Sequence, residues 1–245
     1  MEYKTVAEGR KMPGLRLVLS MGVPGPWGEA AKSIFYVKGI SYVPVGQEVG
    51  ADNLDLVDWT GVRNAPVAVY ESEKPRDRWL DILMLAERLK PTPSLLPESS
   101  DDRAMVIGIA NEICGEWGYG WCRRNMLLAP RGDRLAGEYD CTAETAAASS
   151  KRVADIQRSF TARLKAQKAK GSPYFVGNSL TAADIYWAAF SEMLETPSAE
   201  VNPMPDWLRA VYATSSPEVD AAKDPILIEH RDLVYKRHLK IPMEF

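Results

Sequence analysis

The feature that most limits the fold of this chain is the segment over residues 90–97, which contains three prolines within eight residues. Proline fixes φ and removes a backbone donor, so neither a helix nor a central strand continues through such a segment. Short β-like runs alternate with helical patterns before it, and no convincing strand pattern follows it. We therefore predict an α/β domain over residues 13–90 and an all-helical domain over residues 98–245.

The first half predicts the element order β-α-β-α-β-(β)-α, which is an α/β layer fold. Pro26 suits the first turn of a helix, where its missing N–H costs nothing. Pro66 suits the first residue of a strand, where a lost ladder donor is tolerated. The predicted elements are strands over 15–20, 40–45 and 66–70 and helices over 27–38, 52–59 and 78–89.

The second half predicts helices only. The helix that begins after Thr181 has the clearest start signal, because Thr181 and Asp184 have the spacing of a capping box. Leu180 and Ile185 stand at the two positions of a hydrophobic staple, which fixes the angle of entry into the helix. The predicted helices are 101–121, 142–170, 182–194, 206–213 and 220–238.

Composition narrows the function classes. A net charge of −3 argues against an electrostatic nucleic-acid binder, which shows a strongly basic surface. No apolar run reaches the roughly 20 residues that span a bilayer. The three cysteines are odd in number and form no CxxC pair, which indicates a reducing compartment and predicts the cytoplasm. His230 and His238 lack further ligands at metal-binding spacing, so no metal site is predicted.

Together, the α/β order, the proline-rich linker and a helical half with a capped inner helix resemble the glutathione S-transferase superfamily. The resemblance covers nearly the whole chain from Leu15 onward, and residues 177–184 match the family's folding motif closely. It implies a thioredoxin-like first domain that binds the tripeptide cofactor glutathione at the edge of its sheet. Pro66 looks like the family's cis-proline, which leaves the backbone of Ala65 free to pair with the cysteinyl part of glutathione.

The resemblance also places cofactor-binding residues on two loops of the first domain. Asp77 and Arg78 stand where the family carries an acid–serine pair at a helix start, which holds the γ-glutamyl end. Arg78 either pairs with a glutathione carboxylate through its planar fork or fills the pocket. Gly25-Pro26-Trp27 stands where related members place a serine or cysteine before the proline, and Gly25 supplies neither group. Trp27 either lines the cofactor site or packs the first helical turn.

Catalysis in this family is mainly activation of the glutathione thiol, whose pKa is near that of free cysteine, about 8.5. The thiolate needs a hydroxyl, a helix N-terminus or a cation beside it. Ser20 lies roughly where other members place a tyrosine, so it is the candidate catalytic hydroxyl. The alternative is a strand-end hydroxyl bonded to nearby backbone. Trp117 and Trp121 resemble the wall of the acceptor-substrate site, with interdomain packing as their alternative role.

Two functions from different classes remain open. The first is a glutathione-dependent transferase or thiolytic lyase that attacks a hydrophobic electrophile through the glutathione thiolate. The second is a catalytically silent binding or regulatory protein, which the residues Gly25 and Arg78 favour. A disulfide reductase is disfavoured because the first-helix loop contains no cysteine. Family members usually dimerise, so the resemblance implies a homodimer.

Overall fold

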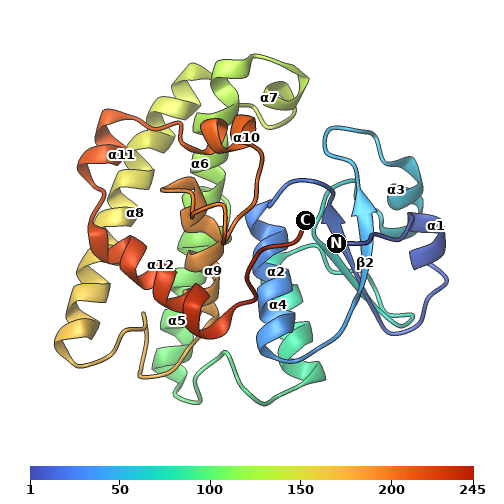
Figure 1. The fold of residues 1–245 in the computed structure, drawn as a ribbon, viewed down its shortest axis with the longest axis horizontal. Coiled ribbons are helices and arrows are strands. Elements are labelled where there is room, and N and C mark those ends of the chain that lie inside the picture. The colour runs from blue at the N-terminus through green and yellow to red at the C-terminus, as the bar shows by residue number, and fades with distance from the viewer. The chain divides into compact units, whose positions relative to one another are not determined.

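The computed structural model describes residues 1–245, which divide into two compact units. Unit 1 comprises Met1–Ser94 together with Pro242–Phe245, and unit 2 comprises Leu95–Ile241. The division falls inside the proline-rich segment over 90–97. Figure 1 shows a small mixed α/β unit and a larger unit made of helices. The predicted fold class, an α/β part followed by an all-α part, is confirmed.

A three-stranded mixed sheet in the order β2-β1-β3 forms the centre of unit 1. The middle strand β1 (Leu15–Ser20) pairs in parallel with β2 (Val43–Gln47) and antiparallel with β3 (Val67–Tyr70). Every residue of β1 except its last is buried. A strand that is covered on both faces needs a nearly continuous apolar run, which explains the leucines and valine of this strand.

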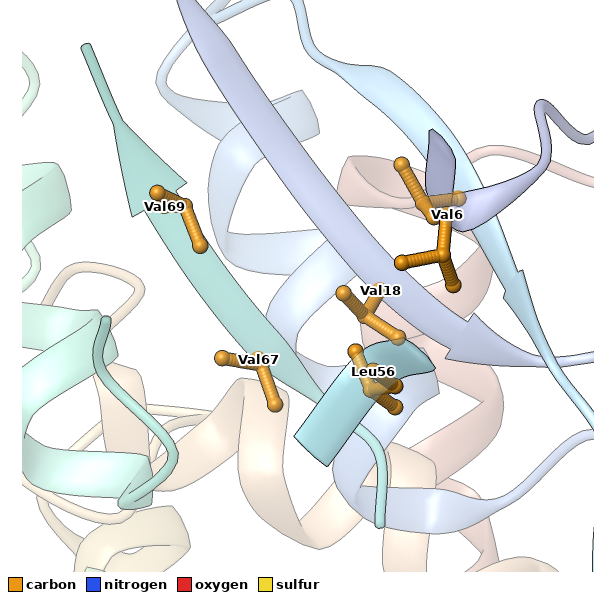
Figure 2. Packing of buried hydrophobic residues seen from close by; sticks show 6 residues of the cluster. Val6, Val18, Leu56, Val67 and Val69 are labelled. Atoms are coloured by element: carbon orange, nitrogen blue, oxygen red, sulfur yellow. The ribbon is translucent and has the colours of Figure 1, made fainter. Parts of the chain in front are cut away.

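One face of the sheet is closed by a cluster of aliphatic side chains. Figure 2 shows side chains of this cluster on the strands and on two short helices, α1 (Val6–Gly9) and α3 (Leu54–Thr60). Two further helices, α2 (Pro26–Val37) and α4 (Trp79–Leu89), pack against each other on the opposite side of the sheet (Figure 1). The buried members of the cluster are Val6, Val18, Val45, Leu56, Val67 and Val69.

Three details of unit 1 differ from the sequence predictions. The second strand begins at Val43 rather than at residue 40, because residues 40–42 follow a left-handed Gly39 as irregular chain. The optional fourth strand is reduced to one antiparallel bridge between Ala68 and Arg76. The first helix, α1, was not predicted, although Thr5 and Glu8 form a complete capping box before it.

Unit 2 is built around α9 (Ala182–Phe190), all nine residues of which are buried. This helix packs against α5 and α12, while α6 packs against α8. No helix of the structure is both long enough and apolar enough to cross a membrane. The other helices are α5 (Ser100–Cys114), α6 (Tyr119–Leu128), α7 (Arg134–Glu138), α8 (Ala143–Ala169), α10 (Asp206–Tyr212), α11 (Pro217–Ala221) and α12 (Pro225–His238), with 3-10 turns η1 (Ala129–Arg131) and η2 (Ser191–Met193).

Two helices predicted as continuous are broken. The predicted helix over 101–121 ends at Cys114, and the next helix starts at Tyr119. A Cβ at Gly118 would lie 2.8 Å from two backbone carbonyl oxygens, so the break requires glycine there. The predicted helix over 220–238 is divided because Pro225 opens a new helix, α12, in place of continuing α11.

Candidate functional site

The candidate residues of unit 1 gather at one end of the sheet. In the antiparallel register of β1 and β3, Val18 lies opposite Val67. The end of β1 at Ser20 therefore meets the start of β3, which follows Pro66. The loop from Ser20 leads directly into α2, so its first turn begins at this same sheet end.

The N-terminus of α2 is open. Gly25 is the N-cap residue, with φ −61° and ψ 123°, and no side chain caps the first turn. A Cβ at Gly25 would meet no atom within 4 Å. The N–H of Gly28 finds no acceptor in the chain, whereas the N–H of Glu29 donates to the Gly25 carbonyl at 2.9 Å. The first-turn amides of a helix carry partial positive charge, so this end is suited to an anion.

Ser20 is engaged by a neighbouring side chain. Its hydroxyl donates to Oε1 of Gln47 at 3.0 Å, and the Gln47 amide in turn donates to the carbonyl of Glu48 at 2.7 Å. Gln47 is buried. The single proton of the Ser20 hydroxyl is therefore used within the sheet, and a catalytic role for this residue stays a prediction.

The peptide bond between Ala65 and Pro66 is cis, as the family resemblance implies. β3 begins one residue after Pro66, so Ala65 lies beyond the end of the ladder. Its backbone N–H and C=O form no hydrogen bond within the chain. Because neither the N–H nor the C=O of this half-buried residue is bonded, both are available to pair with an extended ligand.

Asp77 and Arg78 follow a segment that runs antiparallel to β3 in the direction of this peptide. The backbone bonds between Ala68 and Arg76, at 2.8 and 2.9 Å, run the chain antiparallel to β3, which carries the following residues back toward Pro66. Arg78 is the N-cap residue of α4, and its side chain makes no capping bond. Both side chains are exposed and form no hydrogen bond or ion pair within the chain. Trp27 is half-buried in the first turn of α2.

The predicted acceptor-site residues of unit 2 have different surroundings. Trp117 is 46% exposed and has a left-handed backbone, with φ +61°. The ring of Trp121 meets the edge of Tyr139, with centroids 6.0 Å apart. The Arg124 guanidinium lies 4.5 Å from the Trp121 centroid and 4.4 Å from that of Tyr139, a cation–π arrangement. Burial lowers the pKa of Arg124, yet an arginine stays charged at neutral pH.

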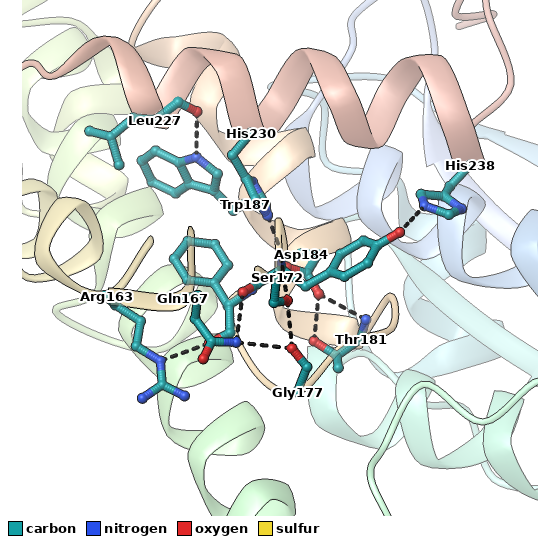
Figure 3. Close-up of polar contacts among 12 residues, drawn as sticks. Arg163, Gln167, Ser172, Gly177, Thr181, Asp184, Trp187, Leu227, His230 and His238 are labelled. Atoms are coloured by element: carbon teal, nitrogen blue, oxygen red, sulfur yellow. Dashed lines mark hydrogen bonds and ion pairs between the residues drawn. The ribbon is translucent and has the colours of Figure 1, made fainter. Parts of the chain in front are cut away.

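A buried polar network surrounds the capping box and was only partly visible in the sequence. The Asp184 carboxylate accepts from the amide and the hydroxyl of Thr181, at 2.8 and 2.7 Å. It also accepts from the Phe175 amide at 2.8 Å and lies 2.9 Å from Nε2 of His230 (Figure 3). The predicted capping box is confirmed. With four partners and no exposure, Asp184 serves the fold rather than a reaction.

The chain's own thiols are enclosed. Cys114, Cys122 and Cys141 are buried, and none of them forms a disulfide. Burial raises the pKa of Cys114 well above its ordinary value and that of Cys122 to about 11. Burial likewise raises the pKa of Cys141. These thiols are therefore protonated at neutral pH and poor nucleophiles. No three His, Cys, Asp or Glu side chains gather as a metal-binding group.

Comparison with known proteins agrees with this fold. Residues 136–217 match the family model for the glutathione S-transferase C-terminal domain. A glutathione transferase Omega 3C from Trametes versicolor is 18% identical, with a TM-score of 0.62 over 95% of this chain and 89% of that one. Rice GST1, solved with glutathione, is 20% identical, with a TM-score of 0.62 over 95% and 94%.

A glutathione S-transferase from Methylobacillus flagellatus, solved with glutathione bound, is 14% identical, with a TM-score of 0.64 over 91% of this chain and 95% of that one. No curated protein matches the chain in sequence. The two units together define the glutathione S-transferase fold. Residues 136–217 therefore match the glutathione S-transferase C-terminal domain family, and the whole chain has the fold of the glutathione S-transferases that its sequence pattern resembles.

Proposed function

We propose that this chain binds glutathione at the sheet end of unit 1 and acts as a glutathione-dependent transferase or thiolytic lyase. The observation that carries the proposal is the pair of helix N-termini, those of α2 and α4, that no N-cap side chain closes. Glutathione carries carboxylates and a reacting thiolate on separate parts of an extended peptide. Helix N-termini favour such anions.

In this proposal, three kinds of group hold the peptide. The unused backbone of Ala65 pairs with the cysteinyl part, as an added strand would. The exposed Asp77 carboxylate binds the γ-glutamyl ammonium, and the Arg78 guanidinium binds a carboxylate through its planar fork. Neither side chain has to break an existing bond to do so.

The thiolate is stabilised by the first turn of α2 rather than by a side chain. Gly25 has no side chain, and the Ser20 proton is donated to Gln47. The partial positive charge of the helix end and an unused amide such as that of Gly28 are the remaining stabilising groups. The thiolate then attacks a hydrophobic electrophile, for which Trp117 and Trp121 are the proposed acceptor-site residues. A cytoplasmic location and a homodimer belong to the same proposal and rest on the family resemblance.

A catalytically silent binding or regulatory protein is the second candidate. The absence of a hydroxyl or thiol at the α2 N-cap, together with the occupied Ser20 proton, favours it. Calorimetric titration with glutathione, followed by an assay with a generic aryl halide, separates the two candidates. Binding with turnover supports the transferase, and binding without turnover supports the silent protein. The absence of both binding and turnover would contradict the proposed glutathione site and would indicate a remodelled pocket.

Arg78→Ala tests how the cofactor is held. We expect the dissociation constant for glutathione to rise about tenfold, because a charge-assisted hydrogen bond contributes roughly 1.5 kcal/mol or more. Lys74→Ala is the matched control, since Lys74 is an exposed cation of the same loop whose ammonium makes no bond in the chain. An unchanged constant for Arg78→Ala would remove that residue from the site.

A further inference from the structure

Helix α3 of unit 1 leaves apolar side chains exposed to solvent. Its inner side is anchored by Leu56, which is fully buried in the aliphatic cluster that closes one face of the sheet (Figure 2). Leu54 and Val57, by contrast, are 75% and 38% exposed. They are three residues apart, so they are neighbours on one face of the helix. A surface helix ordinarily has polar residues on the face turned away from the core, so the packing of unit 1 does not account for this pair.

The loop before α3 adds a third exposed apolar side chain, that of Val49, which is 49% exposed. Asn53, the N-cap residue of α3, fixes this loop against the helix start. Its Nδ2 donates to the Glu48 carbonyl at 2.9 Å, and its Oδ1 accepts from the Glu48 amide at 3.2 Å. Residue 48 is therefore held at the first turn of the helix. The side chains of Val49, Leu54 and Val57, which we call the apolar patch, thus belong to one fixed segment.

The far end of α3 is fixed as well. The Thr60 hydroxyl donates to the Leu56 carbonyl at 2.8 Å. Gly61 ends the helix in the left-handed conformation, with φ +80°, and its N–H donates to the Val57 carbonyl at 2.8 Å. The helix also packs against α1 (Figure 1). The exposure of the apolar patch is therefore a property of a helix that is held at both ends.

The same segment is strongly acidic. Residues 48–58 contain four acidic residues and no basic one. Oδ2 of Asp58 lies 2.6 Å from Nη1 of Arg10, an exposed ion pair. The exposed Glu48 carboxylate makes no hydrogen bond or ion pair within the chain, and Oδ1 of Asp55 accepts only from the adjacent backbone amide at 2.9 Å. At least two carboxylates beside the apolar patch therefore have no cation as a partner. The acidic residues are Glu48, Asp52, Asp55 and Asp58.

We propose that the apolar patch and its carboxylates form a docking surface for a basic amphipathic helix of a partner protein. Apolar side chains of the partner helix cover the patch, and its lysines or arginines pair with Glu48 and Asp55. Three side chains make a small contact, so the association is of the weak and reversible kind that small interfaces support. No residue of this surface belongs to the candidate glutathione site, so the proposal does not depend on that site.

Charge selects this occupant. A second copy of the chain that docked the same surface symmetrically would bring the carboxylates of both copies together, which is unfavourable. The cytoplasmic face of a membrane is anionic and is repelled by the same carboxylates. A helix with an apolar stripe flanked by cations matches both the apolar and the acidic part of the surface.

A designed helix titrated into the full chain tests the proposal. The probe is a peptide of about 18 residues, long enough to form a helix, with leucines at helical spacing on one face and lysines and alanines elsewhere. One control peptide has the same composition in scrambled order, and the other has glutamate in place of every lysine. By calorimetry we expect saturable micromolar binding of the probe and at least about tenfold weaker binding of both controls. Equal binding of either control, or no binding of the probe at millimolar concentration, would overturn the proposal.

Leu54→Ser locates the contact. It removes the most exposed side chain of the apolar patch and should weaken the probe about tenfold, because burial of one leucine contributes roughly that factor. Tyr36→Ser is the matched control, since Tyr36 is 52% exposed on α2, on the opposite side of the sheet. An equal loss in both variants, or no loss in Leu54→Ser, would refute the location.

Charge variants test the acidic part of the surface. Glu48→Gln and Asp55→Asn should each weaken the probe about 2- to 3-fold at low salt, the range of one exposed ion pair, and the difference should disappear at high salt. Asp155→Asn is the control, because this carboxylate is 66% exposed on α8, and it should leave the affinity unchanged. Dimerisation of the chain that Leu54→Ser abolishes, without binding of the probe, would assign the surface to a second copy and overturn the proposal.

Discussion

The helices α2 and α9 begin in opposite ways. Both start from an extended residue, and both face the same problem, because the first four amides of a helix have no partner within it. In α9 the carboxylate of Asp184 caps the start and is completely buried. In α2 the N-cap is Gly25, and no side chain closes the first turn. The comparison shows that a helix start capped by a side chain of the chain itself stabilises the fold. A helix start without such a cap is available to a ligand.

Asp184→Ala removes the carboxylate that caps the start of α9 and should have the largest effect on stability. It leaves the Phe175 amide, the Thr181 amide and His230 buried without their acceptor. We expect the free energy of unfolding to fall by about 3–5 kcal/mol, as when one partner of a buried pair is removed. Denaturant unfolding measures this change. Asp155→Ala is the control, since this carboxylate is 66% exposed and should cost no more than about 0.5 kcal/mol.

Gly25→Ser should add a hydroxyl at the N-cap of α2, where the natural residue has no side chain. The backbone at Gly25 has an ordinary negative φ, and a Cβ there meets nothing within 4 Å. A serine hydroxyl would donate to the glutathione thiolate, so we expect kcat/KM with an aryl halide to rise about tenfold, equivalent to roughly 1.4 kcal/mol.

Gly25→Ala is the control for this gain, because it adds a side chain without a donor. A pH titration of thiolate absorbance in the complex should show a lower thiol pKa for the serine variant alone. An equal rise in both variants, or no rise in either, would contradict stabilisation by a hydroxyl at this position.

Asp224, the N-cap of α12, is intermediate between the two helix starts and should give the smallest effect. A hydrogen bond from Lys165 and another from the Ile226 amide lower the pKa of its carboxyl. Because the folded-state pKa lies below the unfolded value of about 3.9, this carboxylate stabilises the fold at neutral pH. That contribution is lost as the pH falls through the lowered pKa.

Asp224→Asn keeps a capping oxygen and loses the charge. We expect a loss of a few tenths of a kcal/mol at neutral pH, since this exposed ion pair is screened by solvent. The difference from the unmodified chain should shrink as the pH falls below the unfolded value and should vanish once the pH lies below the lowered pKa of the folded state. Lys165→Gln should lower the free energy of unfolding by the same amount, and the double variant should lower it little further. A difference that persists in acid would exclude the carboxylate charge as its cause.

Much of the architecture followed from local chemistry in the sequence. The prolines over 90–97 indicated the division into two units, and Thr181 and Asp184 indicated the start of the buried helix. The break before Tyr119 was missed because it depends on carbonyl oxygens that approach Gly118 only after folding. The helical spacing of apolar residues continues across this break, so the spacing cannot reveal where one helix ends and the next begins.

The candidate site shows the same limit. The positions of Gly25, Ala65 and Arg78 were predicted through the family resemblance, and the structure gathers them at one sheet end. Their significance depends on unused backbone groups, which no sequence pattern records. The partner of Ser20 was also unpredictable, because Gln47 lies on another strand and the two meet only through the parallel register of β1 and β2.

The enclosure of all three native thiols has a practical consequence. Burial keeps Cys114, Cys122 and Cys141 protonated and away from solvent. A cysteine introduced at Gly25 would therefore be the one alkylated by a maleimide fluorophore, with the natural residues left in place. The rate of that labelling, measured with and without added ligand, would show directly whether a ligand occupies the start of α2.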